Sequence, residues 1–142
     1  MTLRRWVAAV TGLALFAEAA GVVMINWILG RVVDRQSMSL DGLDPGVMAT
    51  TTWVMGGVFG LYLVGCGAVL LTAAVRDRGP GRWARIVLIT CAVVHGVLGA
   101  LAVGLVGWNA FACLMVVLGL MVLSLLSYGE RGPAQASPPP PG

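Results

Sequence analysis

Four long apolar stretches, separated by polar segments, make up most of the chain. They cover residues 6–29, 51–75, 83–105 and 110–127. A helix rises about 1.5 Å per residue, so each stretch has the length that crosses a hydrocarbon core of about 30 Å. Because a helix satisfies its own backbone hydrogen bonds in lipid, the pattern predicts an all-α bundle of four transmembrane helices. We expect residues 1–128 to form this single membrane domain.

The polar segments between the stretches have the composition of loops. Residues 30–50 contain an Asp-Pro-Gly turn signal, and the basic segment 76–85 turns at Gly-Pro-Gly. Beyond the last stretch, residues 129–142 end in SPPPPG. Proline-rich sequence of this kind cannot bury a core, so we expect a disordered tail there.

The composition excludes an ordinary soluble domain. Hydrophobic residues make up 58% of the chain and charged residues 11%, whereas soluble domains carry about 25% charged residues. The basic residues are nine arginines and no lysine. This usage is typical of GC-rich bacterial genomes, so we expect a bacterial plasma membrane protein. There is no phosphate-binding loop, dinucleotide fingerprint or nucleophile–base pattern, so neither an enzyme class nor a cofactor is indicated.

The arginines indicate how the helices are oriented. Loops on the cytoplasmic side of a membrane carry an excess of Arg and Lys. With the N-terminus inside, seven arginines fall on the cytoplasmic side and two outside, which predicts that both termini are cytoplasmic. This topology accounts for the net charge of +3 without a nucleic-acid partner. Anionic lipid headgroups are the expected partners of four arginines in the inner loop: Arg76, Arg78, Arg82 and Arg85.

The start of the chain also has the features of a cleaved signal peptide. A basic lead (MTLRR) precedes an apolar run, and Ala17-Glu18-Ala19 imitates a cleavage site. The apolar stretch continues past that point to Leu29, which favours a retained membrane anchor. Cleavage would leave three spans.

All five tryptophans fall near predicted membrane boundaries, where such rings are enriched. Trp6 and Trp83 lie at the inner boundary, and Trp27, Trp53 and Trp108 lie at the outer one. The tryptophans therefore serve as depth markers for the residues between them.

Three ionisable side chains fall at one depth near the bilayer midplane. Glu18, Tyr62 and His95 lie on different stretches, about 18 Å from an inner tryptophan or about 13.5 Å from an outer one. The fourth stretch places Val117 at that depth and contributes no polar group. A carboxylate in the membrane interior is costly unless it is neutral or partnered, so Glu18 is the leading candidate for a functional residue.

Two cysteines share the faces of these residues. Cys66 follows Tyr62 by one helical turn, and Cys91 precedes His95 by one turn. If the second and third helices are antiparallel neighbours, Tyr62 can oppose His95 while Cys66 opposes Cys91. The cysteines lie in apolar stretches without a Cys-x-x-Cys motif, so neither a disulfide framework nor a zinc ribbon is indicated.

Three interpretations of this polar layer are open. The three ionisable side chains can hydrogen-bond to one another and hold the helices in register. They can also form a proton or cation site, because a Glu–His pair can exchange a proton near neutral pH. Alternatively, Cys66, Cys91 and His95, with Glu18 as a fourth ligand, can hold a metal ion.

Small residues at four-residue spacing favour close helix packing. The pattern occurs as Gly56-x-x-x-Gly60 and as Gly96-x-x-x-Ala100-x-x-x-Gly104. Such patterns pack helices within one chain or join two chains. Besides the lipid bilayer, the expected partners are therefore a second copy of the chain or a larger membrane complex.

The segment 15–21 (LFAEAAG) resembles the first-helix motif of the small multidrug resistance transporters. Those proteins have four spans and work as dimers, and their membrane-embedded glutamate binds protons and cationic drugs in turn. The resemblance implies this role for Glu18. The third stretch departs from that family by lacking its aromatic and Gly-rich pattern, and the segment 30–50 is longer than the corresponding loop.

The layout of the whole chain resembles the small four-span membrane proteins common in actinobacterial genomes. These often have a Glu-Ala pair in the first span and an inner loop of the Gly-Arg-x-Ala-Arg type, here at residues 81–85. This second resemblance implies the fold and a membrane location, and it implies no activity.

Together these features predict a small multi-pass membrane protein with an accessory or structural role, held together by its midplane polar layer. The alternative is a dimeric proton-coupled exporter of small molecules. In that alternative Glu18 exchanges protons for substrate, with Tyr62 and His95 lining the path.

Overall fold

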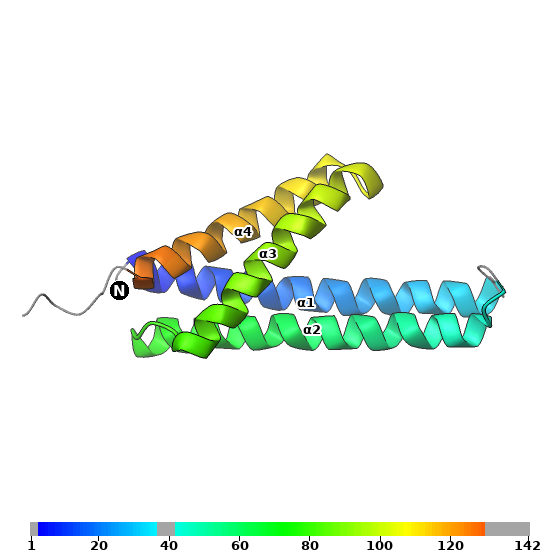
Figure 1. Cartoon of the computed structure of the whole chain (residues 1–142), viewed down its shortest axis with the longest axis horizontal. Coiled ribbons are helices and arrows are strands. Elements are labelled where there is room, and N and C mark those ends of the chain that lie inside the picture. Colours follow the sequence, from blue (N-terminus) through cyan, green and yellow to red (C-terminus); the bar gives the residue numbers. More distant parts are fainter. Residues whose placement is uncertain (1–2, 37–41, 130–142) are drawn as a thin grey trace, which may run out of the picture.

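The computed structural model describes residues 3–36 and 42–129 of the chain. Within these ranges it has four α-helices and no strand, which confirms the predicted all-α fold (Figure 1). Each helix is long and apolar enough to cross a membrane. Apart from Gly129, the predicted tail lies outside the described residues. The helices are α1 (Leu3–Gln36), α2 (Pro45–Arg76), α3 (Arg82–Leu105) and α4 (Trp108–Gly129).

The first two helices extend beyond the apolar stretches. With 34 and 32 residues, α1 and α2 are about 51 and 48 Å long, which exceeds a hydrocarbon core of about 30 Å. Most of the segment 30–50 is therefore helical. α2 begins at Pro45 because the Asp44 carboxylate accepts hydrogen bonds from the N–H groups of Gly46 and Val47 at 2.9 and 3.1 Å.

The four helices form two hairpins that diverge from each other (Figure 1). α1 and α2 lie side by side along their length, whereas α3 crosses them obliquely and α4 returns along α3. The C-terminal end of α4 comes back to the N-terminal end of α1, while the turn between α3 and α4 lies away from the first hairpin. The bundle is therefore packed at the end with the basic inner loop and open toward the other end.

Glycines bring α1 and α2 together. A Cβ added to Gly67 on α2 would lie 3.0 Å from the carbonyl oxygen of Gly12 on α1, and one added to Gly60 would lie 2.5 Å from Val23. Gly56 is closed off in the same way by a side chain of α1. The Gly56-x-x-x-Gly60 pattern therefore packs two helices of one chain.

The small-residue pattern on α3 contributes less to packing. The closest approach to α4 comes from Gly99, which lies against Met115. Of the residues in the pattern, Gly96 faces α4, whereas Ala100 and Gly104 are exposed. Most of the Gly96-to-Gly104 face is therefore turned away from α4.

Polar contacts close the packed end of the bundle. Arg4 of α1 forms an ion pair of 2.6 Å with Asp77, directly after α2. Arg5 donates to the carbonyl oxygen of Ala74 at 2.8 Å, where a cation satisfies a free carbonyl at the helix C-terminus. The guanidinium of Arg4 also lies 5.6 Å from the ring centre of Tyr128, near the end of α4. Three helix ends are thereby held together.

Most of the tryptophans project from the protein surface, as suits side chains at a membrane boundary. Trp53 differs from the others, because its indole N–H donates to the carbonyl oxygen of Trp27 at 3.1 Å and its ring lies against Gly30. Trp53 therefore also packs α2 onto α1. Four tryptophans are at least half exposed: Trp6, Trp27, Trp83 and Trp108.

Candidate functional site

Glu18 of α1 and His95 of α3 meet inside the bundle. The Oε2 atom of Glu18 lies 2.8 Å from Nε2 of His95. The side chain of His95 is 2% exposed and that of Glu18 is 17% exposed. The two residues belong to different hairpins, so their contact links the hairpins across the angle between them.

The other ring nitrogen of His95 determines where the protons lie. Nδ1 is 2.8 Å from the carbonyl oxygen of Cys91, one helical turn earlier. A carbonyl oxygen only accepts hydrogen bonds, so Nδ1 carries a proton and donates it. The Cys91 sulfur is 3.7 Å from the same nitrogen, which makes it the weaker neighbour.

Glu18 and Nε2 of His95 then share one further proton. Either a neutral carboxyl group donates to a bare Nε2, or an imidazolium N–H donates to a carboxylate. In both arrangements the pair has no net charge. Without the shared proton, Nε2 and the carboxylate would face each other with lone pairs only. A neutral and hydrogen-bonded pair avoids the high cost of an isolated charge in a membrane interior.

A cleft of about 230 Å³ lies against this pair. Glu18 and His95 are the ionisable residues of its lining, and the other lining residues are apolar. Gly21 and Ile25 continue the Glu18 face of α1 along the cleft. Because residues from all four helices contribute, the cleft occupies the angle where the two hairpins diverge. The remaining walls are formed by Val22, Phe59, Leu63, Leu98 and Leu114.

Tyr62 does not join the pair, which corrects the expectation of three converging side chains. Its hydroxyl donates to the carbonyl oxygen of Val87 at 3.1 Å. Among the described residues no hydrogen bond connects Tyr62 with Glu18 or His95. The cause is the crossing of the helices: α3 passes over α2 obliquely (Figure 1), so Tyr62 meets the first turns of α3. Equal depth alone therefore does not determine which side chains meet when helices cross.

Cys66 of α2 and Cys91 of α3 both belong to the buried core of the bundle. Both are fully buried free thiols. They do not assemble with His95 into a metal centre, because both ring nitrogens of His95 are already engaged. In the part of the chain that the structure describes, no group of three or more His, Cys, Asp or Glu side chains could hold a metal ion. The geometry therefore gives the metal interpretation no support.

The four arginines of the inner loop fall into two groups. Arg76 and Arg78 line a pocket of about 380 Å³ between the end of α2 and the start of α3. Arg82 and Arg85 are not among its lining residues. The guanidinium of Arg85 instead approaches Gly129 at the end of α4. The fold therefore does not bring all four arginines together at one headgroup site.

A second buried polar contact was missed by sequence reasoning. Thr11 Oγ1 of α1 and Ser124 Oγ of α4 are 3.2 Å apart, and both residues are 0% exposed. Each oxygen also lies near a backbone carbonyl of its own helix. One hydroxyl therefore donates across the interface while the other donates within its helix. No residue pattern marked Ser124, because isolated serines occur on lipid-facing and buried positions alike.

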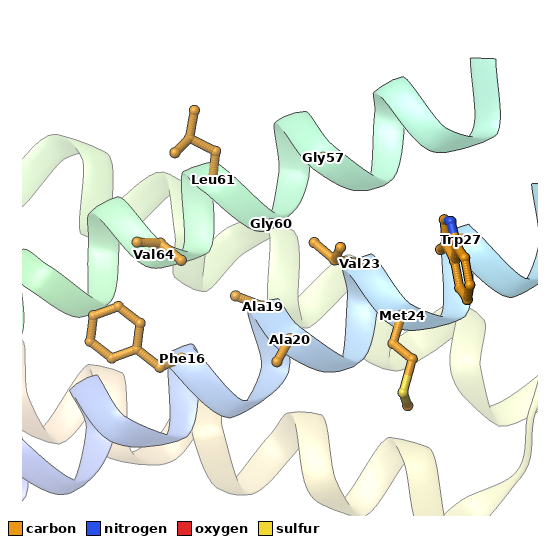
Figure 2. A pocket seen from close by; sticks show the side chains of 10 residues that line it. All are labelled: Phe16, Ala19, Ala20, Val23, Met24, Trp27, Gly57, Gly60, Leu61 and Val64. Atoms are coloured by element: carbon orange, nitrogen blue, oxygen red, sulfur yellow. The ribbon is translucent and has the colours of Figure 1, made fainter. Parts of the chain in front are cut away.

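A larger groove lies on the opposite side of α1 (Figure 2). It has a volume of about 670 Å³ and runs between residues Phe16–Trp27 of α1 and Gly57–Val64 of α2. Its lining contains no ionisable side chain. Ala20 lines the groove two positions after Glu18, which is about 200° around the helix. Glu18 therefore faces the cleft and not this groove.

Comparison of the chain with protein-family models, curated proteins and solved structures found no match. The four apolar helices define a small multi-pass membrane protein. Its distinguishing internal feature is the hydrogen-bonded Glu18–His95 pair beside an apolar cleft.

Proposed function

We propose that the protein has a structural or accessory role in the membrane, and that the Glu18–His95 pair fastens its two hairpins together. The observation that carries this proposal is the 2.8 Å contact between Glu18 and His95. The second nitrogen of His95 is engaged by Cys91 at 2.8 Å. Because the exchangeable protons of the pair are used in bonds within the bundle, the pair is suited to holding helices together.

The Glu18–His95 pair lies where the packing between the two hairpins gives way to the cleft. The Thr11–Ser124 contact lies about two helical turns nearer the packed end than Glu18. Beyond the pair the hairpins separate and the cleft begins. Interhelical hydrogen bonds in membranes contribute about 0.6 kcal/mol on average and up to about 1.7 kcal/mol. Removing one partner is more costly, since it leaves a buried polar group unpaired.

A double-mutant cycle tests the fastening role. The variants are Glu18→Ala, His95→Ala and the double substitution, and the measurement is the free energy of unfolding in bicelles. We expect a coupling energy of about 1 kcal/mol or more between the two sites. A coupling energy near zero would contradict the proposal, because the two side chains would then stabilise the protein independently of each other.

The cleft supports a second candidate function, a dimeric proton-coupled exporter. Glu18 borders about 230 Å³ of mainly apolar space and remains 17% exposed, which suits a lipophilic cation. Such a cation at Glu18 would take the place of the shared proton. His95 lines this cleft, whereas Tyr62 is not among its lining residues, so the proposed path involves Glu18 and His95.

Flux measurements separate the two functions. Purified protein in proteoliposomes is given a pH gradient and tetraphenylphosphonium as the lipophilic cation. The exporter predicts proton-driven flux that Glu18→Gln abolishes while the melting temperature stays unchanged. Absence of flux in the parent protein, or equal flux in the variant, would exclude transport of this cation through Glu18. Native mass spectrometry adds a second criterion, since a monomer contradicts the dimeric exporter.

We also propose that the protein resides in a bacterial plasma membrane with both termini in the cytoplasm. The support is the excess of arginine at the packed end, which holds Arg4, Arg5 and the inner loop. The cleft then lies toward the outer leaflet. A C-terminal green fluorescent protein fusion should be fluorescent, and a C-terminal alkaline phosphatase fusion should be inactive. A non-fluorescent green fluorescent protein fusion together with an active phosphatase fusion would place the C-terminus outside and contradict the proposed topology.

A further inference from the structure

The inner loop builds a concave basic pocket between α2 and α3. Its volume is about 380 Å³, and Arg76 and Arg78 supply its cationic side chains. Val69, Ala73 and Ala84 line the same pocket with apolar surface. The lining therefore combines cationic groups from the loop with apolar groups from two membrane helices.

The start of α3 adds hydrogen-bond donors at this pocket. Gly81 is the residue that caps α3, and no side chain caps the N–H groups of the first turn. A Cβ added to Gly81 would meet nothing within 4 Å, so the space beside it is open. The free N–H groups and partial positive charge of a helix N-terminus favour phosphate oxygens.

No carboxylate of the described residues forms an ion pair with the two arginines of the pocket. Among the described residues, the ion pairs are Arg4–Asp77 and Glu18–His95. Asp77 lies between the two pocket arginines in sequence, but it ends α2 in a left-handed conformation (φ 51°) and directs its carboxylate to Arg4. Arg76 and Arg78 are therefore left facing the pocket without a carboxylate partner in this part of the chain.

The pocket lies at the level of a membrane boundary. Trp83 is the second residue of α3 and is 80% exposed, as suits a ring in the headgroup region. Toward the membrane interior the pocket continues along the apolar residues Val69 and Ala73 of α2. A bound molecule would thus place an anionic group at the loop and an apolar chain along α2.

We infer that this pocket binds the phosphate of an anionic phospholipid headgroup. Arg76 and Arg78 contact the phosphate oxygens, the first N–H groups of α3 donate to them, and an acyl chain follows the apolar side of α2. Arg82 and Arg85, which have the same charge and lie on the same loop and helix start, take no part in this site. The inference does not depend on the role of Glu18.

Native mass spectrometry of the delipidated full chain in detergent tests the site. The chain is titrated with phosphatidylglycerol, with zwitterionic phosphatidylcholine, and separately with inorganic phosphate. We expect the parent protein to retain phosphatidylglycerol at lower concentration than phosphatidylcholine. Arg76→Gln and Arg78→Gln should each weaken phosphatidylglycerol binding about fivefold, since one arginine near a lipid surface contributes about 1 kcal/mol.

Arg82→Gln is the matched control, because it removes the same charge outside the pocket. It should change phosphatidylglycerol binding by less than twofold. An equal loss for all three arginine variants would overturn the site in favour of diffuse surface attraction. Equal binding of the two lipids would overturn the headgroup selectivity. The lipid assignment would be overturned if inorganic phosphate bound as well as phosphatidylglycerol and with the same dependence on the arginines.

A second variant tests the pocket without removing any charge. Ala84→Leu fills part of the pocket while all arginines remain in place. We expect it to weaken phosphatidylglycerol binding with an unchanged melting temperature in detergent. Unchanged phosphatidylglycerol binding in this variant would show that the lipid does not bind in the pocket. This test remains valid even if an arginine variant fails to fold.

Discussion

Nδ1 of His95 lies 2.8 Å from the carbonyl oxygen of Cys91, its neighbour one turn earlier on α3. This contact requires a proton on Nδ1 whatever the state of Glu18. His95 is the single histidine of the chain, so uniform ¹⁵N-histidine labelling reports on it alone. Solid-state NMR of the protein in bilayers should show a protonated and hydrogen-bonded Nδ1. A signal from a bare Nδ1 would contradict the proposed proton arrangement.

Substitutions of Glu18 should separate hydrogen bonding from charge. The amide of glutamine can donate to Nε2 of His95, as a protonated carboxyl group does. Glu18→Gln should therefore keep most of the stability, whereas Glu18→Ala should lower the free energy of unfolding by about 1–3 kcal/mol because His95 loses its partner. Equilibrium unfolding in bicelles provides the measurement. Equal losses in the two variants would show that the contact with Nε2 is not what stabilises the bundle.

The Thr11–Ser124 contact should stabilise the packed end of the bundle. Ser124→Ala leaves the buried Thr11 hydroxyl without its partner on α4, and we expect a loss of about 0.5–1.5 kcal/mol. Ser127→Ala is the control, since the Ser127 hydroxyl donates to the carbonyl oxygen of Leu123 on its own helix and the residue is only partly buried. The same unfolding assay measures both variants. A larger effect at Ser127 would be inconsistent with the described packing.

The contact between α1 and α2 depends on the absence of a side chain at Gly60. An added Cβ there would lie 2.5 Å from Val23, so Gly60→Leu should separate the helices and destabilise the protein by about 1–3 kcal/mol or more. At Gly57 an added Cβ meets nothing within 4 Å. Gly57→Leu should therefore leave the melting temperature in detergent nearly unchanged. Similar melting temperatures for the two variants would contradict this packing.

Much of the fold follows from local features of the sequence. The length of each apolar stretch predicts the four helices. The Asp44-Pro45-Gly46 segment indicates a turn within a loop, whereas in the structure Asp44 caps α2 and Pro45 begins it. The pattern did not predict that α1 continues to Gln36, because charged residues after Gly30 signal the end of the apolar core and not the end of the helix. Hydropathy marks the membrane boundary, whereas backbone hydrogen bonding decides where a helix stops.

The candidate site could be predicted only in part. Counting depth from the tryptophans placed Glu18 and His95 together, and the structure joins them at 2.8 Å. The same count placed Tyr62 with them, and this was wrong because depth carries no information about the angle at which α3 crosses α2. The Thr11–Ser124 contact could not be found at all, since it depends on which faces of α1 and α4 meet.

The sequence alone determined that this protein has four apolar helices and that three of them carry an ionisable group near the midplane, since length and polarity along one chain are local properties. Only the tertiary structure decided which of these groups are partners. The divergence of the hairpins produces the cleft beside Glu18. The turn between α2 and α3 places Arg76 and Arg78 in a pocket and leaves Arg82 and Arg85 outside it. Both results depend on crossing angles, which arise from side-chain packing between helices distant in sequence.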